Sequence, residues 1–260
     1  MSSLVRVELD SDKDEPPESE LASAVRAVLF ATGLEEFPYA THGGTLFVVS
    51  FASKLFGVTC RHVFGDFPPE ALLVTQDRHG KKGSRFASIQ GIRYPSSPRR
   101  EAIGTDIIDL CVIEFSQEIG QEFFHGTAFP LDVHRIGTSR PGNELVVIGM
   151  LKDPTAIDGH DISVNWCRLE FTDVGISADP TLRRGVAGYH EPSFQNLTGI
   201  SGAPVFDRTS KRLCGMVVRG GMDGSHLAVV HYIDIFDIMA LIEAVAAGDD
   251  SKDYIKTVID

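Results

Sequence analysis

The sequence lacks the features that mark a membrane protein or a secreted protein. Its longest unbroken apolar run covers only Leu145 to Leu151. A membrane-spanning helix needs roughly 20 such residues, so none is predicted. The first thirty residues show no basic start followed by an apolar stretch, so we expect no secretory signal. These absences favour a cytoplasmic protein without a membrane partner, and a hydrophobic content of 43% indicates a folded globular chain.

Cysteine is scarce, and its spacing is irregular. The four cysteines are 51, 56 and 47 residues apart, and no Cys-x-x-Cys pair occurs; they are Cys60, Cys111, Cys167 and Cys214. The usual paired spacing of metal ligands is therefore absent, and we expect neither a metal nor another cofactor. In a protein without a secretory signal, such cysteines are predicted to be reduced and mostly buried.

Basic residues are also few. The chain has 24 of them against 36 acidic residues, which gives a net charge of −12. Nucleic acid and anionic membranes repel such a chain at long range, so neither is an expected partner. The exception is segment 76–100, in which Asp77 is the one acidic residue and seven are basic: Arg78, Lys81, Lys82, Arg85, Arg93, Arg99 and Arg100. This segment is typical of a solvated loop or hairpin, and a docking surface for an acidic partner is the alternative.

The chain begins with an extension that differs from the rest. Residues 8–20 are acidic, poor in apolar side chains and carry a double proline, which predicts a flexible segment. Apolar residues at helical spacing then predict a short helix from Ser19 to about Thr32. We therefore expect an extension over residues 1–42 and a main domain over residues 43–260.

The main domain carries many short runs rich in Val, Ile, Phe and Thr between turn signals. Such runs are typical of a β-sandwich or β-barrel and not of alternating β and α units. A final helix is predicted within Ile233–Ala247, before Gly248. The predicted strands are Thr45–Ser50, Leu55–Thr59, Ala71–Thr75, Ile107–Phe115, Glu144–Met150, Ile162–Phe171, Pro204–Phe206, Arg212–Arg219 and His226–Tyr232.

Three patterns contain residues suited to nucleophilic catalysis. They are Val-Thr-Cys-Arg-His around His62, Asp-Leu-Cys-Val-Ile from Asp109, and Gly-Ile-Ser-Gly-Ala-Pro around Ser201. A serine hydroxyl needs a neighbouring base, and histidine, with an ordinary pKa of about 6.5, suits that role. A carboxylate then orients the imidazole. Small residues beside the serine let the amides of Gly199 and Ser201 approach a substrate carbonyl as an oxyanion hole.

The order His, Asp, Ser, with separations of 47 and 92 residues, is more specific than any one pattern. Together the three segments resemble the Thr-Ala-Ala-His, Asp-Leu-Ala-Val-Ile and Gly-Asn/Asp-Ser-Gly-Gly-Pro motifs of trypsin-like (chymotrypsin-fold) serine peptidases, in the texture of their bacterial, HtrA-like branch. The resemblance covers Gly43 to Ala246 and leaves no room for a PDZ domain. It implies an all-β fold of two six-stranded antiparallel β-barrels with a cleft between them. His62 and Asp109 would come from the first barrel and Ser201 from the second.

Three positions deserve comparison with the family motifs. Ile200 precedes the serine where secreted digestive members carry an aspartate that pairs with a new N-terminus, so activation by that route is not expected. Ala203 replaces a family glycine, which is a small change. Asp106 competes with Asp109 for the role of orienting carboxylate, and we favour Asp109 because the apolar strand begins directly after it.

The resemblance also implies where a substrate binds. Its backbone would pair with the strand formed by Val218, Arg219 and Gly220. Gly220 and Gly221 are expected to leave the mouth of the pocket open. Gln195 would form the pocket floor, so a basic substrate side chain has no charged partner there.

An acidic substrate side chain has three candidate partners, which are His226, His231 and Arg219; a solvated or core position is the alternative for each. The sequence thus favours an intracellular serine endopeptidase that cleaves protein or peptide substrates and is regulated by a protein partner. A catalytically silent trypsin-like fold acting as a protein-binding module is the first alternative. An α/β-hydrolase esterase is disfavoured, because that fold needs the order Ser, acid, His and a helix after the serine.

Overall fold

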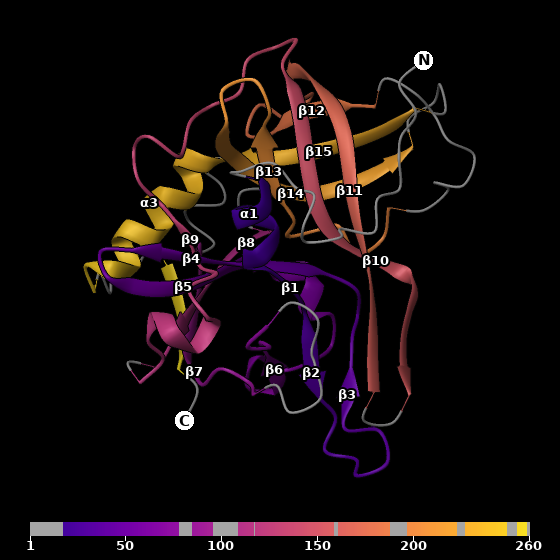
Figure 1. The fold of residues 1–260 in the computed structure, drawn as a ribbon, viewed down its shortest axis with the longest axis vertical. Helices are drawn as coiled ribbons and strands as arrows, with labels where there is room; N and C mark the ends of the chain where they lie inside the picture. Colours follow the sequence, from indigo (N-terminus) through magenta and orange to yellow (C-terminus); the bar gives the residue numbers. More distant parts are fainter. Residues whose placement is uncertain are drawn as a thin grey trace.

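The structure is a computed structural model that describes residues 18–77, 85–95, 109–116, 118–158, 161–187, 197–222, 227–248 and 254–258. Residues 1–17, most of the predicted flexible segment, lie outside this part of the chain. So do Asp106, Gln195 and His226. The described residues form mostly antiparallel β-structure (Figure 1), as the all-β prediction requires.

The first half of the chain and the C-terminal strand β16 form a seven-stranded sheet, which we call the first sheet. Its strands follow the order β1-β4-β5-β8-β7-β16, and β9 pairs with β4 in parallel. A small sheet of β2 (Leu29–Ala31), β3 (Tyr39–Ala40) and β6 (Leu72–Leu73) lies beside it. The strands of the first sheet are β1 (Val25–Ala27), β4 (Thr45–Phe51), β5 (Lys54–Cys60), β7 (Ile89–Pro95), β8 (Leu110–Phe115), β9 (Phe129–Pro130) and β16 (Tyr254–Val258).

The second half forms a closed six-stranded barrel in the order β10-β11-β12-β15-β14-β13. Its two longest strands continue well past their predicted ends and run beyond the barrel as a ribbon (Figure 1). Alternate side chains from five of its six strands fill the interior, and the remaining strand turns Gly185 toward it. The strands are β10 (Glu144–Asp158), β11 (Asp161–Ile176), β12 (Arg183–Val186), β13 (Pro204–Asp207), β14 (Arg212–Met222) and β15 (Ala228–Asp234).

The helix predicted from Ser19 to Thr32 is wrong over most of its length. Helix α1 covers only Glu18–Ala24, and β1 then pairs with β4 at the edge of the first sheet. All three residues of β1 are buried. A run of residues that is buried on every side fits a helical pattern and a strand equally well, so periodicity could not separate them.

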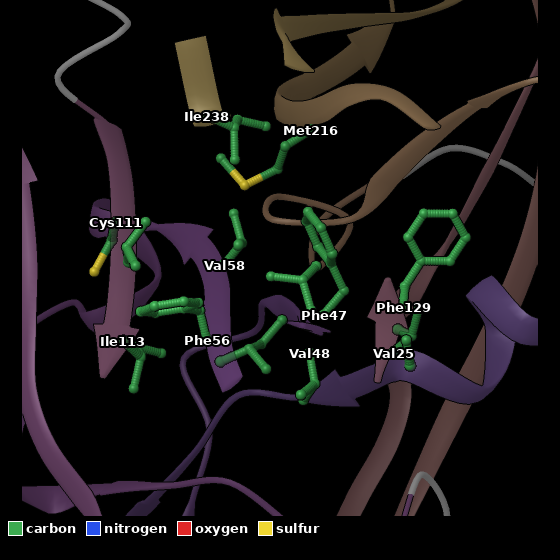
Figure 2. Packing of buried hydrophobic residues seen from close by; sticks show 14 of the residues in the cluster. Val25, Phe47, Val48, Phe56, Val58, Cys111, Ile113, Phe129, Met216 and Ile238 are labelled. Carbon is green, nitrogen blue, oxygen red and sulfur yellow. The ribbon is translucent and has the colours of Figure 1, made fainter. Parts of the chain in front are cut away.

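The predicted C-terminal helix is present as α3 (Ile235–Ala246). Asp234 caps it, because its side chain accepts a hydrogen bond from the backbone N–H of Phe236 at 3.1 Å. The helix packs against strands of both halves of the molecule. Figure 2 shows Ile238 of this helix beside Met216 of the barrel and close to Val58 of the first sheet. The larger core cluster therefore joins the two halves, and the junction between them is fixed.

Within the basic segment 76–100, the structure describes residues 76–77 and 85–95, and these are not all solvated. The segment contains β7, in which Arg93 is buried and donates from Nε to Oε1 of Glu114 at 2.9 Å. The remaining described residues include Arg85, which is exposed and lies over the ring of Phe123.

Two further expectations concern burial and membranes. All four cysteines are free and buried, as predicted. No helix among the described residues is both long enough and apolar enough to cross a membrane.

Candidate active site

His62 lies in a short 3-10 helix, Arg61–Phe64, that follows directly on β5. Val63 and Phe64 of this turn are buried, which leaves the imidazole about half exposed. Val63 packs so closely on Gly44 that a Cβ there would come within 2.6 Å of it. The turn is thus anchored by its apolar residues, and His62 projects from it into solvent.

Asp109 directly precedes β8, and the pairing of β8 with β5 brings it to the same end of the sheet as His62. Leu110, the next residue, stands opposite Cys60. Both carboxylate oxygens are engaged: Oδ2 lies 2.5 Å from Nδ1 of His62, and Oδ1 accepts from the His62 backbone N–H at 2.9 Å. Asp109 therefore fixes both the position of the backbone and the orientation of the ring.

Ser201 lies in a tight turn whose shape requires glycine. Gly199 and Gly202 have φ values of +106° and +86°, in the region that other residues rarely adopt. A Cβ on Gly202 would stand 1.9 Å from the carbonyl oxygen of Thr45, and one on Gly199 would stand 2.7 Å from the amide nitrogen of Lys152. The turn packs backbone against backbone, and only glycine fits at these two positions.

Thr45 of the first sheet holds the serine turn, and sequence analysis did not single it out. Its N–H donates to the carbonyl of Ser201 at 2.8 Å, and its hydroxyl donates to the carbonyl of Gly199 at 2.8 Å. The same hydroxyl accepts from the N–H of Met150 at 2.9 Å. A strand was predicted to begin at Thr45, but nothing in the sequence indicated a bond across 154 residues.

The carbonyl of Val217 links the histidine segment to the serine turn. It accepts from the N–H of Gly202 at 2.8 Å and from the Cys60 thiol at 3.2 Å. Cys60 stands two residues before His62, and Gly202 directly follows Ser201. The structure therefore gathers the predicted trio at the junction of the two halves.

The serine hydroxyl does not contact the histidine in this arrangement. Oγ of Ser201 donates instead to the carbonyl of Val218 at 3.0 Å. Among the described residues, no hydrogen bond joins Ser201 to His62. The amides of Gly199 and Ser201 likewise have no acceptor in this part of the chain, while the intervening Ile200 N–H donates to Leu197. Two unengaged N–H groups thus flank the turn.

The predicted substrate strand lies beside this turn. Val218 is an irregular position in β14, where the pairing with β15 shifts, and Arg219 is exposed. The open space expected at both glycines is found at Gly221 alone. A Cβ on Gly220 would come within 2.6 Å of the Ile200 side chain. That expectation fails at Gly220 because the residue before the nucleophile is large and apolar.

Cys60, His62 and Asp109 have ligand atoms within 4.8 Å of one another, a group that irregular cysteine spacing did not reveal. Burial and the nearby Asp109 carboxylate raise the pKa of the Cys60 thiol well above its usual range. The thiol is therefore protonated and donates to the Val217 carbonyl, while the paired imidazole and carboxylate suit proton transfer.

Comparisons with protein families and curated sequences give no match. Solved structures do resemble the chain. Human heparin binding protein is 12% identical, with 86% of this chain and 91% of that chain covered and a TM-score of 0.59. The scabies mite inactivated protease paralogue S-D1 is 13% identical, with 85% and 92% covered and a TM-score of 0.56. An inactive mutant form of Rv3671c from M. tuberculosis is 15% identical, with 96% and 98% covered and a TM-score of 0.51.

These likenesses define the class of fold. The chain has the chymotrypsin-like double-barrel fold, which confirms the fold predicted from the three motifs. At 12–15% identity they carry no activity from one protein to another. One neighbour is described as an inactivated paralogue, so the chemistry has to be argued from the residues of this chain.

Proposed function

We propose that this protein is a serine endopeptidase in which Ser201 is the nucleophile, His62 the general base and Asp109 the orienting carboxylate. One observation carries the proposal: Asp109 holds His62 by both its ring and its backbone at the junction where the serine turn is anchored. The His62 ring is half exposed, so it is not a core histidine that needs a partner because it is buried. The paired carboxylate therefore supports a catalytic role. No metal or other cofactor takes part.

The hydrogen bonds define the direction of proton transfer. In this proposal Asp109 accepts from Nδ1–H of His62, which leaves the lone pair of Nε2 to take the serine proton. A rotation about χ1 moves Oγ of Ser201 from the Val218 carbonyl toward that nitrogen, and staggered rotamers interchange at low cost. Attack on a substrate carbonyl then forms an acyl-enzyme, the imidazolium protonates the leaving amine, and water completes the hydrolysis.

The turn supplies the electrostatic part of catalysis. The N–H groups of Gly199 and Ser201 are unengaged within the described residues and lie on either side of Ile200. Such donors stabilise the negative charge that develops on the substrate oxygen, and each is worth roughly 3–4 kcal/mol.

Substrate binding and serine release are coupled in this proposal. The Val218 carbonyl now accepts from the serine hydroxyl. A substrate that pairs with the strand at Val218, Arg219 and Gly220 presents its own backbone N–H to that carbonyl. The hydroxyl is displaced and becomes available to His62. The catalytic trio is thereby completed when substrate arrives.

Three finer expectations do not depend on the catalytic geometry. We propose that the protein is related to the bacterial, HtrA-like branch of the peptidases, that it is cytoplasmic, and that a protein partner controls it. The absence of an aspartate at Ile200 supports a mode of activation other than pairing with a new N-terminus.

The alternative function is a binding module without catalysis. One observation favours it: the Ser201 hydroxyl donates to the Val218 carbonyl and not to His62. In that case the strand 218–220 would hold a peptide without cleaving it. The two functions differ in whether the serine is activated.

Reaction with a fluorophosphonate probe distinguishes them, because the probe reacts with an activated serine and needs no peptide recognition. We expect one covalent adduct on the wild-type chain, mapped to Ser201 by mass spectrometry. Ser201→Ala and His62→Ala should give none. Equal labelling of wild type and His62→Ala, or no labelling of either, would refute the peptidase proposal.

A further inference from the structure

Three basic side chains lie in line across three neighbouring strands of the barrel. His231 of β15 stands opposite Arg184 of β12 on one side and opposite Arg219 of β14 on the other. Directly opposed residues in antiparallel strands have Cβ atoms about 5 Å apart. We call Arg184, His231 and Arg219 the basic row.

The basic row points away from the barrel interior, because side chains alternate along a strand. The two neighbours of His231 in the chain, Val230 and Tyr232, belong to the core of the barrel. Gly185, which follows Arg184, faces the interior, where a Cβ would meet Val230 at 3.0 Å. The row is therefore on the outer surface, and its β14 member is exposed.

The row reaches the candidate active site at its Arg219 end. Arg219 directly follows Val218, whose carbonyl holds the hydroxyl of Ser201 at 3.0 Å. The next residue, Gly220, packs against Ile200 of the serine turn. A peptide paired with this strand would carry its side chains past the row.

The charges of the row act on one another. The pKa of His231 is lowered, first by burial and then by the guanidinium groups of Arg219 and Arg184. Asp179 acts in the opposite direction, but it also accepts two hydrogen bonds from its neighbour Thr181. Nδ1 of His231 lies 2.8 Å from the Ser177 hydroxyl. The charged groups that act on His231 are thus two guanidinium groups and one carboxylate, on a chain of net charge −12.

We propose that the basic row is a specificity site for an acidic side chain, a glutamate or aspartate on the substrate segment that precedes the cleaved bond. This inference rests on the proposed function, because it names the substrate class of the same cleft. Guanidinium groups pair with carboxylates through two parallel hydrogen bonds, which gives geometry as well as charge. Arg219 makes the contact, and Arg184, on the other side of His231, adds a second positive charge.

Binding to the Ser201→Ala variant tests the site without requiring catalysis. The probes are octapeptides that alternate glutamate, glutamine or lysine with serine and carry a neutral dye; the alternation places every test side chain on one face of an extended strand. Fluorescence polarisation should show the glutamate peptide binding at least about fivefold more tightly than the glutamine peptide. The overall negative charge alone would favour the lysine peptide, so the expected ranking opposes non-specific attraction.

Two further variants in the Ser201→Ala background locate the preference. Arg219→Gln should remove most of it. Arg212→Gln is the matched control, since Arg212 is an exposed arginine on the same strand, about 23 Å along it, and it should leave the preference unchanged. Equal affinity for the three peptides, a preference for lysine, or loss in both variants would overturn the proposal. So would a heparin fragment that binds at Arg219 when the glutamate peptide does not.

The outcomes separate this inference from the proposed function. Fluorophosphonate labelling of Ser201 together with no preference for glutamate would refute the proposed specificity site and support the proposed peptidase activity. A glutamate preference that is lost in Arg219→Gln, together with no fluorophosphonate labelling of Ser201, would support a module that binds acidic peptides. It would refute the peptidase proposal.

Discussion

The hydroxyl of Ser201 donates to the carbonyl of Val218 at 3.0 Å, on the strand next to the serine turn. In the proposed peptidase, this bond occupies the acceptor that a bound peptide would use and directs the nucleophile to Val218 instead of His62. The segments that carry His62, Asp109 and Ser201 are held at one junction by Asp109, Thr45 and the Val217 carbonyl. The serine hydroxyl and the imidazole are nevertheless not hydrogen-bonded to each other among the described residues.

The orienting carboxylate gives the sharpest mutational contrast. Asp109→Asn should lower the turnover rate by about 10⁴-fold, because the amide stabilises the wrong imidazole tautomer while the fold persists. Asp106→Asn is the matched control and should change the rate little. Steady-state hydrolysis of a peptide ester by the two variants is the measurement. The reverse ranking would show that the orienting role belongs to Asp106.

The threonine that anchors the serine turn should matter for both stability and activity. Thr45→Val leaves the Met150 N–H and the Gly199 carbonyl without their buried partner, which costs about 1–3 kcal/mol. Denaturant unfolding would measure this loss, and activity of the folded fraction should also drop because the turn loosens. Thr45→Ser keeps the hydroxyl and should retain most of both. Identical behaviour of the two variants would contradict the anchoring role.

Truncation from the N-terminus should have a threshold. Deleting residues 1–17 should change the free energy of unfolding by no more than about 0.5 kcal/mol, because segment 8–17 has almost no apolar side chains to pack. Deleting residues 1–30 removes Leu21, Val25, Leu29 and Phe30, all buried, and should yield unfolded or insoluble protein. Thermal unfolding of both truncated proteins is the measurement, and instability of the shorter deletion would contradict the prediction.

The thiol beside the histidine should be slow to react. The raised pKa of Cys60 and its burial predict that iodoacetamide modifies it far more slowly than a free thiol at pH 7.5, and at full rate only after unfolding. Activity should survive mild alkylation of the folded protein. Rapid loss of activity in wild type but not in Cys60→Ala would show that the thiol is accessible in the native state.

The lowered pKa of His231 predicts a dependence of stability on pH. The folded protein binds fewer protons at this site than the unfolded chain, whose histidine titrates near 6.5. This contribution to stability is therefore complete above pH 6.5 and is lost as the pH falls below it. Relative to His231→Gln, wild type should lose stability between pH 7.5 and pH 5, as measured by urea unfolding. A parallel pH dependence in the two proteins would exclude the effect.

The sequence predicted what its local patterns contain and missed what depends on distant pairing. The strands around Val48 and Ile148 are strongly apolar and were found. Strand β12 was missed because Arg183 is a charged residue in a strand, and only Tyr232 and Asp173 in the folded barrel accept its hydrogen bonds. Strand β1 was taken for helix because Val25 is buried by residues far away in the chain.

The candidate site likewise has a part that the sequence predicted and a part that it did not. The residue types and order of His62, Asp109 and Ser201 could be predicted, because each lies in a short motif next to a strand. The contact of Ile200 with Gly220, the anchoring by Thr45 and the rotation of Ser201 toward Val218 arise where two halves of the chain meet. No spacing along the sequence encodes the side-chain rotamer that completes or interrupts the trio.

The most direct test of the peptidase is the appearance of new peptide ends. A denatured protein mixture with blocked amino termini is incubated with wild type or with Ser201→Ala purified in parallel, and newly formed N-termini are identified by mass spectrometry. The account predicts new termini with wild type alone, with acidic residues enriched before the cleaved bonds. No new termini from wild type, or the same set from both proteins, would contradict it.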